Sequence, residues 1–583
     1  MDLPLVFKLL RSSFSICLLL PLYYLLGYGV LSVVNGVFKR SFEFKFEDVL
    51  VASLATLSFI VIGCKLVRVY PEIELIGQIA AIVAIACLIL GLSLSKLNKI
   101  ELRFPLPNVR YSIIWLALFN VYLLRAVIKA RTLADAIYIP SRFNTDIFLY
   151  IRRSIVFLAQ AGRSHSENGQ TILDILYNSP KLLSTVVYTT FTRVSGDIGI
   201  AATLVTSIVL AAITLKCLCL INERGKYKLV TYATAALIIF QPIWCWLQDQ
   251  FYWSNLLCIY LLIYILEDLL TSKPIDRWLI KYTLALTALA GFYPSQIPFF
   301  CLAAIAGLLF HPDIIRPRRY LLSVIGIAIV ILCLFSTQYL DTNEVVKHFD
   351  LTDAKHGQNF NYIAFWTFLY FVPKTGGTPK DIGAILLISG SLLLAAIAIR
   401  YCFRAIPAQS GWFKLLFALY FLYSASYLLL PGEYRQSKFF FTYIVPLIVW
   451  CLIKVVNENR FRRKKPIQII LPALAVFVMV NSFDKPYKPH VSSQISTVIT
   501  QAKANNKPLT VYTADGSIAH GYYYLAYQLR QLDFQLFTGC PQLADLESIQ
   551  GDRTIIIAES CPKVTSSVRD KIIYTDINGE NDD

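Results

Sequence analysis

Residues 76–95, IGQIAAIVAIACLILGLSLS, contain no charged side chain over a length of twenty residues. An α-helix rises about 1.5 Å per residue, so this stretch is about 30 Å long and matches the hydrocarbon thickness of a bilayer. Because hydrocarbon offers no water, a spanning segment must satisfy its own backbone hydrogen bonds. The apolar residues do not alternate with period two, which favours helices over a closed barrel. The stretch therefore predicts a transmembrane helix.

Similar apolar runs recur along most of the chain. The 583 residues are 56% hydrophobic and only 16% charged, and the mean hydropathy is +0.58. This composition excludes an ordinary soluble enzyme and predicts an all-α polytopic membrane protein. We expect about fourteen spans, the first of them a retained helix and not a cleaved signal peptide. They lie at residues 14–38, 49–64, 76–95, 111–128, 198–220, 229–240, 252–266, 279–292, 297–310, 320–336, 382–399, 412–430, 439–455 and 467–481.

Positive charge is concentrated in alternate loops. The run 457–465, NENRFRRKK, is strongly basic, whereas the loops 241–251 and 293–296 contain no Lys or Arg. Since basic loops stay in the cytoplasm, the run 457–465 fixes the orientation, and counting back puts the basic loops 96–110 and 311–319 on the same side. The net charge of +17 then reflects orientation in a plasma (inner) membrane and not nucleic-acid binding. Both termini are predicted to be extracytoplasmic.

Four segments follow from this pattern. They are N-terminal transmembrane helices at 1–128, an extracytoplasmic loop with amphipathic helices at 129–197, a transmembrane core at 198–481, and a small C-terminal extracytoplasmic α/β domain at 482–583. A second outer loop is expected at 336–381. In the C-terminal domain we expect strands at 509–512, 534–537, 554–558 and 572–574, and helices at 492–504 and 519–532. Cys540 and Cys561 either form a disulfide, if the outer compartment is oxidising, or remain two free thiols.

Asp146 stands out in the loop 129–197, within the sequence RFNTDIFLY at 142–150. Apolar surroundings disfavour the charged form of a carboxylate and so raise its proton affinity. Asp146 is therefore a candidate general base that takes the proton of an attacking sugar hydroxyl. The alternative is that Asp146 caps a helix at 147–160, because Asp is a good N-cap residue.

Arginines follow Asp146 closely. Arg152 and Arg153 lie in the same loop, and Arg435 and Lys438 form a second outward cluster before the span 439–455. Because arginine pairs bidentately with phosphate oxygens, these residues suit a lipid-linked phosphate. The alternatives are attraction to anionic lipid, worth about 1 kcal/mol per charge, and snorkelling at the membrane interface.

Aromatic and amide side chains crowd the loop that follows the span 229–240. Trp246, Gln248 and Asp249 suit the binding of a sugar ring, and Gln296 is expected to line the same cavity. An interfacial aromatic belt is the simpler explanation for the tryptophans. Motifs with zinc-ligand, P-loop or dinucleotide spacing are not evident in the sequence. We expect no metal site and no cofactor, while a requirement for a divalent metal stays open.

These residues resemble the GT-C superfamily of membrane glycosyltransferases, polytopic proteins that use polyprenyl-phosphate-linked sugars on the outer membrane face. Asp146 resembles the family's acidic first outer loop, the turn 241–253 resembles its outward aromatic turn, and the residues around Arg435 resemble its late outer motif. Four predicted spans precede the acidic loop, where the family commonly has one, and the loop lacks an Asp-Asp or Asp-x-Asp pair.

The resemblance implies transfer of a hexosyl or pentosyl group from a polyprenyl-phosphate donor to a saccharide, lipid or protein acceptor. A transporter or flippase, or a polymerase, of lipid-linked saccharides is the alternative. A transporter typically has an internal repeat and ionisable residues within its spans. The sequence has no clear repeat, and its notable polar groups lie outside the predicted spans, which favours the enzyme.

Overall fold

The computed structural model describes residues 11–15, 19–67, 69, 71–130, 146–158, 165–171, 181–221, 228–249, 251–270, 275–297, 300, 442, 445–457, 465–483, 495–513, 520–549, 553–558, 561–563 and 572–574. The predicted spans at 320–336, 382–399 and 412–430 lie outside these residues, as does 297–310 except for residues 297 and 300. The predicted loop 336–381 and the candidates Arg435 and Lys438 also lie outside them.

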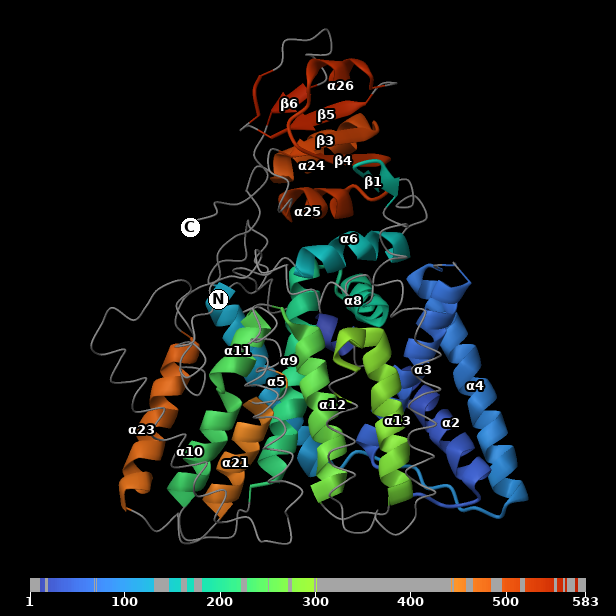
Figure 1. The fold of residues 1–583 in the computed structure, drawn as a ribbon, viewed down its shortest axis with the longest axis vertical. Helices are drawn as coiled ribbons and strands as arrows, with labels where there is room; N and C mark the ends of the chain where they lie inside the picture. Colours follow the sequence, from blue (N-terminus) through green and yellow to red (C-terminus); the bar gives the residue numbers. More distant parts are fainter. Residues whose placement is uncertain are drawn as a thin grey trace.

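Long helices run up and down through the lower part of the molecule and form a bundle (Figure 1). They are α2 (Leu20–Phe38), α3 (Phe46–Leu66), α4 (Ile73–Leu97), α5 (Val109–Ala130), α9 (Ile198–Cys219), α10 (Lys228–Ile239), α12 (Trp253–Leu270), α13 (Ile275–Phe292), α21 (Val445–Asn457) and α23 (Lys465–Ser482). Each overlaps a predicted span, so these helices are confirmed. Within the described residues, seven helical segments are long and apolar enough to cross a membrane: Arg11–Phe38, Phe46–Leu66, Ile73–Leu97, Val109–Lys129, Ile198–Cys219, Lys228–Asp249 and Lys465–Ser482.

Glycines allow α2 and α4 to approach closely. A Cβ added to Gly91 would lie 2.6 Å from the Cβ of Ser32, and one added to Gly36 would lie 2.5 Å from the Cβ of Leu94. Hydrocarbon does not drive apolar helices together, so helices in a membrane associate through close van der Waals packing at small residues. These glycines therefore hold α2 against α4.

A buried carboxylate fastens the beginning of α3 to α12 and α13. Asp48 is fully buried; the hydroxyl of Tyr264 donates to its Oδ1 at 2.6 Å, and Arg277 donates to its Oδ2 at 3.3 Å. The Nζ of Lys281 lies 3.7 Å from Oδ1. A carboxylate at low dielectric needs such partners, because an uncompensated buried charge is strongly unfavourable.

Contacts between helix ends show which of them lie at the same end of the bundle. Lys216 near the end of α9 pairs with Glu47 at the beginning of α3 at 2.6 Å, at the same end of the bundle as Asp48. At the opposite end, Arg125 of α5 donates to the carbonyl of Ser482 at the end of α23. For the described helices, the beginning of α3 and the end of α9 thus share one end of the bundle, and the ends of α5 and α23 share the other, in agreement with the predicted order. The compartment that each end faces remains a prediction.

A parallel sheet forms the core of the C-terminal domain, which we define as residues 495–574. Its strands are β3 (Leu509–Thr513), β4 (Phe534–Thr538), β5 (Thr554–Ile557) and β6 (Ile572–Tyr574), in the order β4-β3-β5-β6. The helices are α24 (Ile495–Asn505), α25 (His520–Gln528) and α26 (Leu543–Glu547). Val511 in β3 pairs with Leu536 of β4 and with Ile556 of β5. All four strands and the first two helices are predicted by the sequence; α26 is not.

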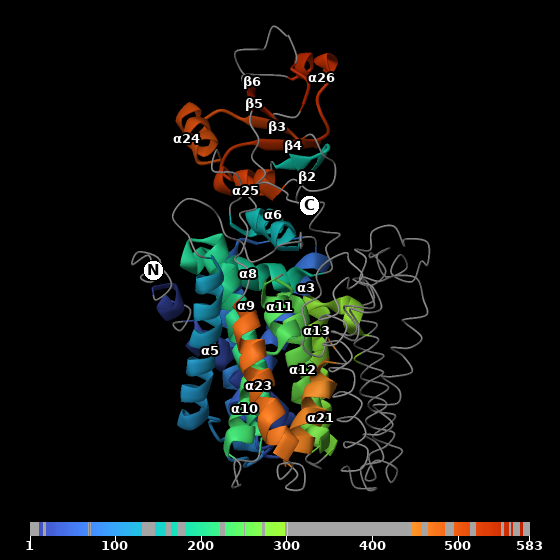
Figure 2. The ribbon, with the colours of Figure 1, turned by 90° about the vertical axis from the view of Figure 1, so that its left-hand side faces the viewer.

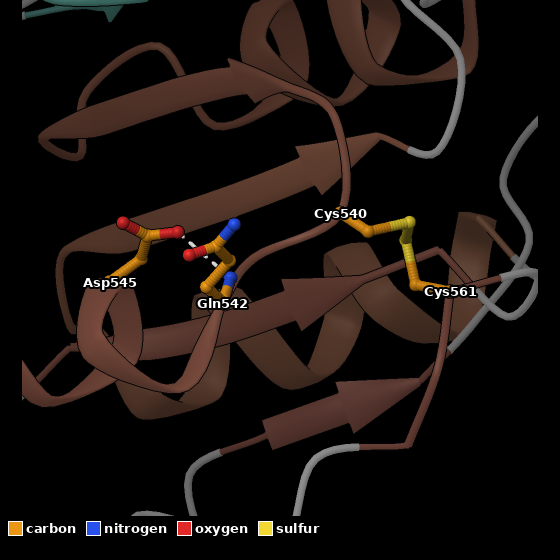
Figure 3. The surroundings of a disulfide bond; sticks show 4 residues. All are labelled: Cys540, Gln542, Asp545 and Cys561. Atoms are coloured by element: carbon orange, nitrogen blue, oxygen red, sulfur yellow. Dashed lines mark hydrogen bonds between the residues drawn. A yellow bond between two sulfur atoms is a disulfide. The ribbon is translucent and has the colours of Figure 1, made fainter.

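A disulfide joins Cys540, which follows β4, to Cys561, which follows β5 (Figure 3). Of the two alternatives left open by the sequence, the structure has the bridge. Beside it the backbone N–H of Gln542 donates to the carboxylate of Asp545 at 2.8 Å, which caps α26.

The loop 129–197 contributes two helices and a hairpin. The helices α6 (Asp146–Leu158) and α8 (Leu182–Ser195) lie between the bundle and the C-terminal domain (Figures 1 and 2). The sequence predicted helices within this loop, and α6 begins at Asp146 itself. The hairpin β1 (Ser166–Glu167) and β2 (Gln170–Thr171) was not expected, and it extends the C-terminal sheet at the edge of β4.

We predict that Gly91→Val destabilises the α2–α4 contact, because the new side chain meets Ser32. Overpacking of this kind costs about 1–3 kcal/mol, so the thermal unfolding midpoint in detergent should fall. The control is Gly77→Val on the same helix, where an added Cβ has no heavy atom within 4 Å. Equal midpoints for the two variants would show that close packing at Gly91 does not hold the helices together.

Candidate functional site

The site region begins with a helix break at the upper end of the bundle. α10 ends at Ile239, and α11 (Pro242–Asp249) begins three residues later. Proline is tolerated in the first turn, where its missing N–H has no helical partner. The side chain of Gln241 accepts from the N–H of Trp244 at 2.9 Å, and the hydroxyl of Tyr122 donates to the carbonyl of Ile239 at 2.7 Å. Protein groups therefore satisfy the backbone at the break, as a membrane setting requires.

A buried set of charges follows at the end of α11. Arg125 donates from Nη1 and Nη2 to the two carboxylate oxygens of Asp249, at 2.7 Å each, and Lys129 donates to the same carboxylate at 2.6 Å. Arg125 also donates to Oε1 of Gln248 at 2.9 Å and to the carbonyl of Ser482 at 3.0 Å. Only 1% of Arg125 is exposed. We call these five residues the α5–α11 cluster.

The α5–α11 cluster joins the points where the chain leaves the bundle. α5 leads toward α6, and α23 leads toward the C-terminal domain, so the cluster fixes the base of both connections (Figure 1). Gln248 and Asp249, predicted to bind a sugar, take part in this fastening, and Gln248 also donates to Ser207 at 3.0 Å. Their predicted role in sugar binding is not decided by these contacts.

Arg125 and Lys129 were not predicted as site residues, because both lie at the end of an otherwise apolar run. A signal was present. Tyr122, Arg125 and Lys129 are spaced by three and four residues, which puts them on one face of a helix. Ionisable residues within a span are by default functional or structural sites with a nearby partner. A polar face on α5 was therefore foreseeable, although Asp249 as its partner was not.

The helix α6, which begins at the candidate base Asp146, is packed from below by the bundle. The hydroxyl of Tyr150 lies 2.9 Å from that of Ser254 in α12, and Thr189 of α8 donates to Ser154 at 3.0 Å. The buried apolar side chains of α6 include Ile147, Ile151, Ile155, Val156 and Phe157. Most of the described side chains of α6 are thus buried, at the boundary between the bundle and the C-terminal domain.

Phe251 connects α6 to the end of α11. Its backbone has φ 55°, and the N–H of Tyr252 donates to the carbonyl of Leu247 at 2.9 Å, which closes α11 with a left-handed residue. This conformation costs a residue with a Cβ about 1–2 kcal/mol. The ring of Phe251 is fully buried and contacts the rings of Tyr150 at 5.8 Å and Tyr188 at 5.5 Å. Strain of this type is common at functional sites, and here it brings the Asp146 helix and the Asp249 turn together.

The two candidate arginines of α6 face different surroundings. Arg152 is 9% exposed; it donates to the hydroxyl of Tyr523 in α25 at 3.1 Å and lies 5.2 Å from the centre of that ring. Arg153 is half-buried. Arg152 therefore lies in the contact between α6 and the C-terminal domain, a position that the sequence did not indicate.

The remaining sugar-binding candidates lie on neighbouring turns. Trp246 is half-buried in α11, and its ring contacts that of Tyr252 at 5.5 Å. Gln296 is 7% exposed in the short helix η2 (Pro294–Gln296), four residues after Phe292, whose ring contacts Trp253 at 5.2 Å. Of the predicted sugar-binding residues, Gln248 and Asp249 share Arg125 as a partner.

No group of three or more His, Cys, Asp or Glu among the described residues is arranged to hold a metal ion. A scan against protein-family models and searches of curated proteins and of solved structures found no match. The residues and their geometry therefore carry the functional argument.

We predict that Asp249→Asn destabilises the protein by about 3–5 kcal/mol, because it leaves Arg125 and Lys129 without their counter-charge. Adding Lys129→Met should recover part of this loss, since the second cation is then removed. The measurement is the free energy of unfolding in detergent. The control is Arg193→Met, which breaks an ion pair with Glu74 whose side chains are 59% and 49% exposed, and such a pair contributes about 0–1 kcal/mol. A loss for Asp249→Asn no larger than that of the control would refute the fastening role.

Proposed function

We propose that this protein is a membrane glycosyltransferase that moves a sugar from a polyprenyl-phosphate donor to an acceptor on the extracytoplasmic face. One observation carries the proposal. The helix that begins at Asp146 and carries Arg152 and Arg153 lies at the end of the apolar bundle, beneath a polar domain (Figure 2). A prenyl-linked donor needs such a place, because its chain prefers hydrocarbon while its phosphate and sugar need polar partners.

The proposed reaction is a direct displacement. The oxygen of the acceptor hydroxyl attacks the anomeric carbon as the bond from that carbon to the phosphate oxygen breaks. Asp146 takes the proton of the hydroxyl, and the phosphate leaves with the electron pair. Arg152 and Arg153, with Arg435 and Lys438, neutralise the phosphate through charge-assisted hydrogen bonds. The sugar inverts at the anomeric carbon, so the reaction needs no covalent intermediate.

Trp246 and Gln296 are the proposed contacts of the sugar ring, together with Gln248 and Asp249. An aromatic face covers the apolar side of a sugar, and amides bond its hydroxyls. Since Gln248 and Asp249 already bond Arg125, they would act at the edge of the site while keeping those bonds. The proposed acceptor is a saccharide, a lipid or a protein.

Two independent features support the extracytoplasmic orientation. The described basic loops, at residues 39–45 and 98–108, lie at the end of the bundle opposite to the C-terminal domain (Figure 1), and basic loops remain in the cytoplasm. The C-terminal domain carries the Cys540–Cys561 disulfide, and disulfides persist in oxidising compartments outside the cytoplasm. Both features support an extracytoplasmic position for α6.

A transporter or flippase of lipid-linked saccharides is the second candidate. It is favoured by the broken passage α10–α11 and by the buried charges at Asp48 and at the α5–α11 cluster, since transporters use broken helices and ionisable residues within spans. Each of these carboxylates is bonded to cations of neighbouring helices near an end of the bundle. That arrangement suits the fastening of helices better than an ion pathway, so the enzyme is the preferred proposal.

For the proposed base, Asp146→Asn and Asp146→Ser should each reduce transfer by at least about 100-fold while membrane insertion persists. Asn and Ser cap helices as well as Asp does, so a purely capping role predicts full activity in both variants. The assay follows transfer of labelled sugar from a polyprenyl-phosphate donor in isolated membranes. Wild-type rates in both variants would eliminate Asp146 as the base.

For the orientation, we predict that Lys503→Cys in α24 reacts with a membrane-impermeant maleimide on intact cells, whereas Arg103→Cys reacts only after lysis. Both positions are exposed and lie in segments at opposite ends of the molecule (Figure 1). The background should have the other free cysteines replaced by alanine. Labelling in the reverse order would place α6 in the cytoplasm and contradict the proposal.

A further inference from the structure

We propose that the C-terminal domain is a positioning element for the Asp146 helix, and that Tyr523 and Asn168 are its positioning residues. The inference rests on the proposed function, because α6 carries the proposed base and phosphate ligands. It adds a role for a domain that the reaction scheme does not use. Two contacts, far apart in sequence, carry it.

The first contact lies between α25 and the upper side of α6. The hydroxyl of Tyr523 accepts from Nη1 of Arg152 at 3.1 Å, and the guanidinium lies over the same ring at 5.2 Å. Burial raises the pKa of the neighbouring Tyr524 and Tyr527, so these phenols of α25 remain neutral. The hydrogen bond and the cation–π contact involve the same ring, so together they fix the position of Arg152 relative to α25.

The second contact is the hairpin β1–β2, which lies between α6 and α8 in the chain. Ser166 and Glu167 pair in parallel with Gln535 and Leu536 of β4. The side chain of Asn168 then bonds Thr538 twice: its Nδ2 donates to Oγ1 at 2.9 Å, and its Oδ1 accepts from the backbone N–H at 3.0 Å. Asn168 has φ 48°, a left-handed conformation that Asn adopts more readily than most residues.

These contacts hold α6 from both sides. From below, Tyr150 and Ser154 fix it to α12 and α8. From above, α25 holds Arg152. Beyond the end of α6, β4 holds the hairpin β1–β2. A displacement of about 1 Å is enough to lower a rate about 100-fold when reacting groups must be aligned. The domain therefore fixes where Asp146 and Arg152 stand relative to a bound donor.

The test combines two variants with two measurements. Asn168→Gly removes both side-chain bonds and retains the left-handed backbone, and Tyr523→Phe removes the bond to Arg152 and keeps the ring. Lys503→Ala, an exposed change on α24, is the matched control. Hydrogen exchange of the full-length protein in lipid nanodiscs reports on α6 without any substrate. Transfer kinetics then report kcat and the KM for the polyprenyl-phosphate sugar.

We expect amide exchange in α6 to accelerate at least about tenfold in Asn168→Gly, with β3 and β5 unchanged. We expect kcat to fall about tenfold in Asn168→Gly and the KM for the donor to rise about threefold in Tyr523→Phe, with no change in Lys503→Ala. Unchanged exchange in α6 would overturn the holding contact whether or not the protein is a transferase. Faster exchange with unchanged kinetics would overturn the positioning role and leave the proposed function standing. If the wild-type protein transfers no sugar, the proposed function fails, and the exchange result alone decides whether the domain holds α6.

Discussion

Hydrocarbon leaves no polar group without a partner, and this constraint shapes the molecule more than any single contact. The break between α10 and α11 releases a carbonyl at Ile239, and Tyr122 of α5 supplies its donor. The next polar positions on the same face, Arg125 and Lys129, then meet Asp249. Tyr122, Arg125 and Lys129, on one side of α5, thus bond polar groups at the helix break and at the end of α11. At the other end of the bundle, Asp48 is bonded in a comparable way to Tyr264 and Arg277.

The site region owes its position to those fastenings. The α5–α11 cluster holds the end of α5 and the end of α23 together. The two connections to the upper layer therefore start from fixed points. Phe251 then presses its ring between Tyr150 and Tyr188 at the expense of a strained backbone. The result is a helix whose first residue is acidic, held at the level where an apolar medium gives way to water. This is the arrangement on which the glycosyltransferase proposal rests.

Hydrophobic runs predict the helices well here because a span must be apolar throughout, and every helix of the bundle overlaps an expected span. The strands of the C-terminal domain are equally foreseeable, since buried parallel strands such as Leu509–Thr513 are short, rich in β-branched residues and bounded by polar turns. Pairings across the sequence are a different matter. Hairpin β1–β2 has only two residues per strand, too few for a periodic signal, and Arg152 meets Tyr523 through tertiary packing alone. The left-handed Phe251 has no local signature either, because glycine is the usual residue there.

The edge pairing between β1 and β4 has a consequence for biosynthesis. Asn168 and Thr538 are 370 residues apart, and a chain is synthesised from its N-terminus at about 5–20 residues per second. The hairpin must therefore wait roughly 20–70 s, while the helices between the two segments are made, before its partner strand exists. During that interval an unsatisfied strand is displayed outside the bilayer, and open strand edges invite association with other chains. The sheet edge is therefore completed only when β4, a segment made long after the hairpin, becomes available.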